Sequence, residues 1–75
     1  MKIRVKLMGM LKDNTPESGQ LELPDQATIA DALQALNVAG ENIAVFSVNG
    51  SLVRDRSCVL NDDDELTVLP PVGGG

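Results

Sequence analysis

The sequence predicts an α+β domain, a mixed sheet of four to five strands with one main helix on one face. Three features of the 75 residues indicate this: strand-like alternation at both ends of the chain, one segment with helical spacing, and a two-residue turn signal between apolar runs. A chain of this length has room for one domain and a modest core that buries roughly 60% of the unfolded surface.

The clearest strand pattern opens the chain. The residues of one parity are apolar: Ile3, Val5 and Leu7. The residues of the other parity are Lys2, Arg4, Lys6 and Met8. This alternation is typical of a strand with one buried face. Residues 13–19 hold Asn, Pro, Ser and Gly and predict a loop, after which 21–23 predicts a short second strand and a hairpin.

A helix is expected after this hairpin. Thr28 can cap its N-terminus, while Asp31 faces the positive end of the helix dipole. The apolar residues that recur at i, i+4 and i+7 are Ile29, Leu33 and Leu36. Asn37 and Gly40 are expected to mark the end of this helix of about ten residues, which needs packing on the sheet for stability.

Three strands are expected in the second half. Residues 43–48 are apolar and β-branched and run into Asn49-Gly50, the strongest two-residue hairpin signal, so 51–53 predicts the returning strand. After the short apolar anchor Val59-Leu60 and an acidic turn, 65–69 predicts the last strand. The first and last strands are expected to pair in parallel at the centre of the sheet. This arrangement is a β-grasp, or ubiquitin-like, fold.

Composition excludes several functions. Six basic residues against eleven acidic ones give a net charge of -5, which makes nucleic acid and anionic membranes poor partners. The chain has no His, Trp or Tyr, so it lacks an imidazole base, and an autonomous enzyme is not expected. No apolar run is long enough for a membrane span or a signal peptide, and the single cysteine fits a cytoplasmic protein.

Three further features have competing interpretations. Cys58 is expected to be a small buried apolar residue, with a persulfide relay as the alternative. The acidic run 62–65 lacks the spaced ligands of a calcium loop, so no metal site is expected. The basic stripe of Lys2, Arg4 and Lys6 is usually a solvated face, but on a docking side it can steer an acidic partner.

The chain is expected to divide into a domain over residues 1–69 and a flexible tail over 70–75. Pro70 and Pro71 keep the exit stiff, while the three glycines 73–75 carry no side chains, so the final carboxylate can enter a narrow channel. Six residues reach about 20 Å at most. The other interpretation of such a glycine run is a frayed end or an expression remnant.

In its whole length the chain resembles the MoaD/ThiS family of ubiquitin-like sulfur carriers. The resemblance rests on the terminal Gly74-Gly75, the preceding Pro70-Pro71-Val72, and the acidic turn Asp62–Glu65 that leads into the last strand. Pro-Pro-Val and the first strand are similar to the small subunit of molybdopterin synthase. The ending 72–75 and the segment 49–53 are similar to the thiamine-biosynthesis carrier.

Two positions depart from the family pattern. Gly73 stands where the molybdopterin type often has Ala or Thr, which leaves the choice between the two types open. Asp63 replaces the Gly that is usual in the acidic turn. Because Asp tolerates the left-handed backbone conformation better than most residues, the turn itself is expected to be preserved.

The resemblance implies a carrier on which partners perform the chemistry. An activating enzyme uses ATP to adenylate Gly75, and a sulfur donor enzyme then converts the terminus to a thiocarboxylate. The chain itself would bind no cofactor. In the molybdopterin type, favoured here, the tail with Val72, Gly73 and Gly74 enters a larger synthase subunit and gives sulfur to a pterin precursor. In the thiamine type the sulfur goes to thiazole synthesis.

The resemblance also implies a docking patch formed by Met8, Leu52 and Leu69. Strand parity supports two of these positions, since Met8 and Leu69 lie opposite the core-facing residues of their strands. Scattered surface apolar residues are the ordinary alternative. Two other functions stay open: a ubiquitin-like modifier joined to lysines through Gly75, and a passive interaction domain with an irrelevant tail.

Overall fold

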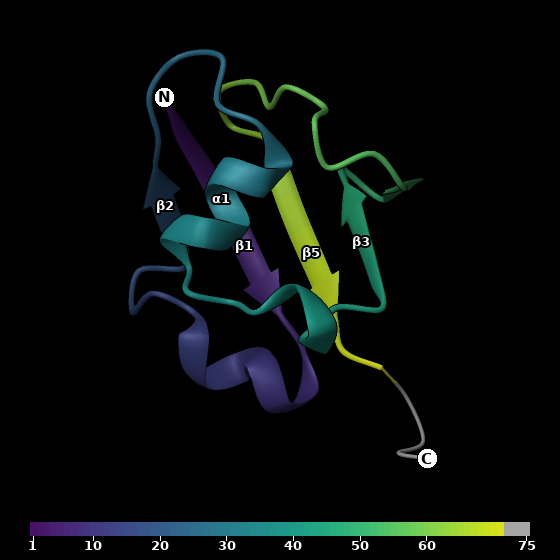
Figure 1. Ribbon diagram of the computed structural model, residues 1–75. Coiled ribbons are helices and arrows are strands. Elements are labelled where there is room, and N and C mark those ends of the chain that lie inside the picture. Colours follow the sequence, from purple (N-terminus) through teal and green to yellow (C-terminus); the bar gives the residue numbers. More distant parts are fainter. Residues whose placement is uncertain (72–75) are drawn as a thin grey trace.

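The computed structural model describes residues 1–71 as a five-stranded mixed sheet with one α-helix across one face (Figure 1). The strands are β1 Lys2–Leu7, β2 Gln20–Glu22, β3 Val45–Val48, β4 Ser51–Val53 and β5 Glu65–Leu69. The helix is α1 Ile29–Ala35, and two short 3-10 helices are η1 Gly9–Asn14 and η2 Gly40–Asn42. The strand order β2-β1-β5-β3-β4 confirms the predicted β-grasp.

The parallel pair at the centre of the sheet joins the two ends of the chain. In β1 and β5, Val5 lies opposite Leu66 and Leu7 opposite Val68. All four side chains are buried, and Leu66 and Val68 have no exposed surface. The predicted parallel pairing of the first and last strands is therefore confirmed, and apolar side chains on one face of these strands form the base of the core.

Two antiparallel pairs flank this centre. β2 pairs with β1 one residue earlier than predicted, over Gln20–Glu22 instead of 21–23. β3 and β4 form the predicted hairpin, with Val48 opposite Ser51. The turn residues Asn49 and Gly50 have φ angles of 53° and 86°. Positive φ at both positions is the type I′ geometry that matches the twist of a hairpin.

Helix α1 has the predicted start and a shorter body. Thr28 and Asp31 form a capping box, each side chain accepting a hydrogen bond from the other residue's backbone N–H. The helix has seven residues instead of about ten. Its end at Asn37 is confirmed, because Asn37 at φ 62° closes a Schellman motif after the C-cap Leu36. In that motif the Val38 N–H donates to the Leu33 carbonyl. Within residues 1–71, no helix is long and apolar enough to span a membrane.

The core lies between α1 and the sheet. It includes the predicted helix stripe, with Ile29 at 0%, Leu33 at 4% and Leu36 at 5% exposure. Cys58 was expected among the buried residues, and this prediction is wrong because its side chain is exposed. The segment after β4 contributes Leu60 to the core instead, at 2% exposure.

Cys58 lies outside the core because it follows a surface turn. The Cys58 N–H donates to the Asp55 carbonyl, and the side chain and backbone N–H of Ser57 donate to the Asp55 carboxylate. These two hydrogen bonds hold the pKa of Asp55 below its usual value, with the side-chain bond as the larger cause. The carbonyls of Arg56 and Cys58 accept hydrogen bonds from the N–H groups of Ala30 and Ile29 at the start of α1, but the first side chain after the turn that enters the core is that of Leu60.

Helix η1 was not predicted, since the sequence indicated only a loop over 13–19. Its position is set by tertiary contacts. Leu11 is 3% exposed in the core, and the Asn14 side-chain amide donates to the carbonyls of Leu36 and Asn37, each at 3.0 Å. η1 therefore connects the end of β1 to the end of α1 and supplies hydrogen bonds that the last turn of a helix lacks.

Because the centre of the sheet is buried, two leucines on strands should differ sharply in the stability that is lost when each is replaced by alanine. Leu66→Ala should lower the free energy of unfolding by about 3 kcal/mol, most of the stability of a domain of this size. Leu52→Ala, at a side chain 72% exposed, should change it by less than about 0.5 kcal/mol. Urea denaturation followed by circular dichroism measures both, and equal losses would contradict the assigned core.

Candidate functional site

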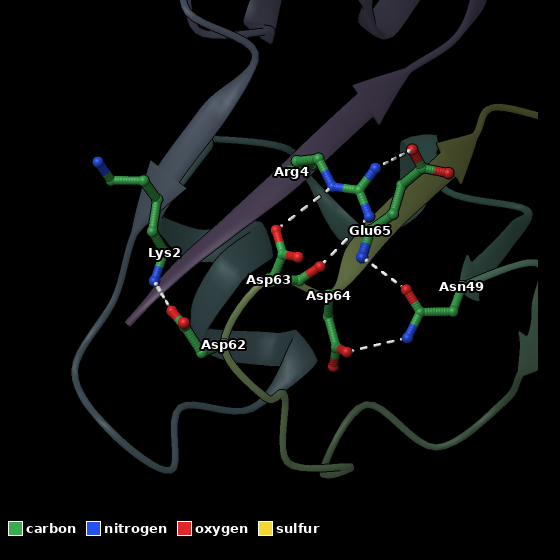
Figure 2. A network of polar contacts seen from close by, with 7 residues as sticks. All are labelled: Lys2, Arg4, Asn49, Asp62, Asp63, Asp64 and Glu65. Atoms are coloured by element: carbon green, nitrogen blue, oxygen red, sulfur yellow. Dashed lines mark hydrogen bonds and ion pairs between the residues drawn. The ribbon is translucent and has the colours of Figure 1, made fainter.

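The acidic turn before β5 is tied to the Asn49-Gly50 hairpin by a polar network (Figure 2). The Asn49 amide donates to Asp64 Oδ1 at 2.9 Å, and the Glu65 N–H donates to Asn49 Oδ1 at 2.9 Å. The backbone adds a third bond, from the Asn49 N–H to the Glu65 carbonyl at 2.8 Å. The turn and the hairpin are thus joined at the point where β5 begins.

The same turn is tied to β1. The Lys2 N–H donates to Asp62 Oδ1 at 2.8 Å, and the Asp63 N–H donates to the Lys2 carbonyl at 2.8 Å. The Arg4 guanidinium lies 3.4 Å from Glu65 and 3.8 Å from Asp63 (Figure 2). Asp63 adopts φ 69°, so the expected left-handed conformation at this position is confirmed.

These contacts give the acidic turn a structural role. Asp62 and Asp64 accept charge-assisted hydrogen bonds from backbone N–H groups. The exposed ion pairs of Arg4 contribute little to stability by comparison. Because Arg4 forms ion pairs with the turn, the basic stripe on β1 that was predicted to steer a partner is reduced to Lys2 and Lys6. The acidic turn therefore fixes the start of β5 to the neighbouring elements. The tail with the predicted reactive terminus follows the other end of this strand.

The end of β5 is held on both sides. The Met8 N–H donates to the Val68 carbonyl at 3.1 Å, and the Ala44 N–H donates to the Leu69 carbonyl at 2.9 Å. The strand keeps its hydrogen bonds up to its last residue. The chain then leaves the sheet at Pro70 and Pro71, next to the end of β1 and the start of β3 (Figure 1).

Apolar side chains gather where the chain leaves. Leu69 lies opposite Val45 of β3. Met8 follows Leu7, the partner of Val68, so it lies beside Leu69 on the other side. Met8 and Val45 are each 40% exposed, on the face of the sheet opposite α1. Leu69 is half-buried because it lies between them on a central strand.

Leu52 extends this surface to the edge strand. It lies opposite Ser47, diagonal to Val45, and is 72% exposed. Val45 was not among the predicted site residues, although strand parity points to it, since the buried Phe46 follows directly. We call these four residues the docking patch: Met8, Val45, Leu52 and Leu69. The structure places the three predicted residues on one face, and their role in docking stays a prediction.

Two shallow hollows flank the docking patch, and each has two basic side chains in a lining that is otherwise mostly apolar. One, of about 390 Å³, is lined by Val45 and Leu52 together with Arg54 and Arg56. The other, of about 410 Å³, is lined by Met8 with Lys6 and Lys12. Four of the six basic residues of an acidic chain therefore lie around this surface.

Comparison with known proteins decides which family has this site. The family model described as the ThiS family matches residues 5–75. The chain belongs to the ThiS family. This confirms the resemblance to MoaD/ThiS proteins, which was inferred from the acidic turn, Pro70-Pro71 and the terminal glycines.

Solved structures with the same fold support this assignment. The putative molybdopterin converting factor, subunit 1, from Pyrococcus furiosus is 27% identical, with a TM-score of 0.73 and 96% and 99% of the two chains covered. Small archaeal modifier protein 1 from Haloferax volcanii is 25% identical, with a TM-score of 0.74 and 95% and 98% covered.

Two further matches are a structure of lower sequence identity and a longer protein that the chain covers only in part. A complex of subunits 1 and 2 of molybdopterin-converting factor from Helicobacter pylori shares the fold at 19% identity, with a TM-score of 0.63 and all of both chains covered. The urease accessory protein UreE of Janthinobacterium sp. (strain Marseille) is 35% identical over 51 residues, 68% of this chain. The chain spans 30% of the length of that curated relative.

The predicted tail lies only partly within the described residues. Pro70 is half-buried and Pro71 exposed. Val72, Gly73, Gly74 and Gly75 lie outside the described residues, so the predicted roles of these four positions stay predictions. What the structure establishes for this ThiS-family chain is the point of exit and the surface around it.

The fastening of the acidic turn can be tested at Asn49. Asn49→Gly keeps the positive φ but removes both side-chain bonds, and should lower the free energy of unfolding by about 1 kcal/mol. Asn49→Ala also strains the left-handed backbone and should cost about 2 kcal/mol. Urea denaturation of both variants measures the difference. No loss in the glycine variant would show that the network does not hold the turn.

Proposed function

We propose that this protein is a sulfur carrier whose reactive group is the carboxylate of Gly75. That carboxylate attacks the α-phosphorus of ATP on an activating enzyme and releases pyrophosphate. A persulfide on a sulfur donor enzyme then attacks the acyl carbon and displaces AMP. A thiol cleaves the resulting acyl disulfide, forming a disulfide with the donor and leaving the thiocarboxylate on Gly75.

The observation that carries this proposal is the position of the exit. The last strand ends at Leu69, between Met8 and Val45 of the docking patch, and the next two residues are prolines. A partner that binds the docking patch therefore lies next to the point where the tail leaves the sheet. Since six residues reach about 20 Å at most, the carboxylate can react inside a partner whose surface rests on the sheet.

The residue inventory supports a carrier that is acted upon. Without histidine, the chain offers no imidazole for acid–base chemistry. Within residues 1–71 no three His, Cys, Asp or Glu side chains are arranged so that they could hold a metal ion. Family membership gives the same coarse conclusion, since ThiS and MoaD proteins are small carriers. The ATP site, the Mg²⁺ and the catalytic cysteines are assigned by the proposal to the partners.

Sulfur transfer to a pterin precursor in molybdopterin synthesis is the acceptor reaction we favour. It is supported by the likeness to subunit 1 of a molybdopterin converting factor over nearly the whole chain. A larger synthase subunit as partner is supported by the complex of subunits 1 and 2 with the same fold. The stiff Pro70-Pro71 exit suits insertion of the tail into such a subunit in the cytoplasm.

Two other acceptors are favoured by specific observations. The matching family model is that of the ThiS family, which supports delivery to thiazole synthesis. The likeness to small archaeal modifier protein 1 supports conjugation to lysine amines. All three reactions begin with adenylation of Gly75. The two sulfur-delivery reactions share the thiocarboxylate and differ in the acceptor of its sulfur, whereas in conjugation a lysine amine becomes bonded to the Gly75 acyl carbon.

The docking patch also indicates the chemistry of the partner surface. Its apolar side chains favour an apolar counterpart, and methionine adapts well to more than one partner. The basic residues of the flanking hollows favour acidic groups around that counterpart. Because exposed charges are screened by salt, binding should weaken as ionic strength rises.

A charge placed in the docking patch should weaken binding. Val45→Asp buries a carboxylate in an apolar contact and should raise KM for the activating enzyme about tenfold, with kcat kept. Val59→Asp is the matched control, since Val59 is an exposed valine at 55% that bridges to Thr28 beside α1. Steady-state adenylation kinetics measure both. Equal effects of the two variants on KM would show that the docking patch does not bind the activating enzyme.

The terminal carboxylate should tolerate no extension. One alanine added after Gly75 displaces the reacting group and should lower ATP–pyrophosphate exchange by the activating enzyme of the same cell at least about 100-fold. The melting temperature should be unchanged, because the addition lies beyond the domain. Exchange at the wild-type rate in the extended variant would contradict the proposal.

A further inference from the structure

Gly9 stands directly under the ring of Pro70. A Cβ added at Gly9 would lie 2.9 Å from Pro70 Cγ and 3.6 Å from Pro70 Cδ. The first distance is shorter than carbon atoms tolerate without a shift of one partner. Gly9 also has φ +56°, a backbone conformation that glycine adopts without strain. The first residue of η1 and the first residue after β5 therefore fit only because Gly9 has no side chain.

The segment that carries Gly9 is anchored in three places. Before it, the Met8 N–H donates to the Val68 carbonyl of β5. After it, Leu11 is buried in the core, and its N–H donates to the Met8 carbonyl at 3.1 Å. At its end, the Asn14 amide is bonded to Leu36 and Asn37 at the end of α1. Gly9 thus offers Pro70 a fixed surface.

The two prolines make the position of Pro70 important. A proline ring restricts φ to a narrow range, so Pro70 and Pro71 transmit a displacement to the residues beyond them instead of absorbing it. Misplacement of a reacting group by 1 Å can cost about 100-fold in rate. A shift of Pro70 changes the direction in which the chain leaves the sheet, and the two prolines cannot correct that direction by rotation about φ.

We propose that Gly9 is a positioning residue for the reaction at Gly75, because its bare backbone seats the Pro70 ring and sets the direction of the tail. This inference rests on the proposed function, since it concerns how the tail reaches the activating enzyme. Gly9 itself touches no reacting atom.

Gly19 provides a matched control. It also has a positive φ, +71°, but a Cβ there would meet nothing within 4 Å. Gly9→Ala and Gly19→Ala therefore introduce the same backbone strain, and only the first also pushes against Pro70. Any difference between them reports the contact with the tail and not the cost of alanine in a left-handed conformation.

The experiment is adenylation of the full-length protein by the activating enzyme, with this protein as the varied substrate and pyrophosphate release as the signal. Gly9→Ala should lower kcat about tenfold and leave KM within about twofold, because the docking patch is intact while the carboxylate is misplaced. Gly19→Ala should keep the wild-type kcat. A variant that merely unfolds in part would raise the apparent KM, because less of it is competent, and would keep kcat.

A second substitution tests the contact itself. Pro70→Ala removes the Cγ that a Cβ added at position 9 would strike. Gly9→Ala in a Pro70→Ala background should therefore cause no further loss of kcat. Equal kcat for Gly9→Ala and wild type, equal losses in the two glycine variants, or a rise in KM alone would each overturn the inference. Absence of adenylation with the wild-type protein would instead overturn the proposed function.

Discussion

The parallel pairing of β1 with β5 is the contact on which the rest of the structure depends. It brings residues 4–7 beside residues 65–68. Leu66 and Val68 face the core without exposed surface, so this pair contributes two of the most deeply buried side chains of the core. Because a parallel pair places both carboxyl ends at one edge of the sheet, the tail must leave beside Met8 and Gly9.

The two ends of β5 therefore differ in chemistry. Its start is fastened by charged and amide side chains of the acidic turn, Arg4 and Asn49 (Figure 2). Its end is surrounded by apolar side chains, with basic residues farther out. The first arrangement holds the strand in register, and in the proposed function the second presents a surface to a partner. A carrier of this kind requires both, because a reaction at the last residue is only as precise as the strand that delivers it.

The sequence predicted the elements with strong local signals and missed those set by tertiary contacts. The parity of β1, the capping box at Thr28 and the type I′ turn at Asn49-Gly50 depend on neighbouring residues and were confirmed. η1 depends on Asn14 reaching the end of α1, which no local pattern shows. Cys58 was misjudged because burial there is decided by a surface turn. Within the site, Val45 follows from strand parity, whereas the Gly9–Pro70 contact required the register of β1 with β5.

The intact mass of the protein isolated from its native cell tests the central claim most directly. The account predicts a fraction that is heavier than the sequence by the difference between one sulfur and one oxygen atom, located by tandem mass spectrometry at Gly75. Conjugates to lysines through Gly75 would identify a modifier. A terminus that stays a plain carboxylate, even after the purified protein is given ATP, its activating enzyme and a persulfide donor, would contradict the account.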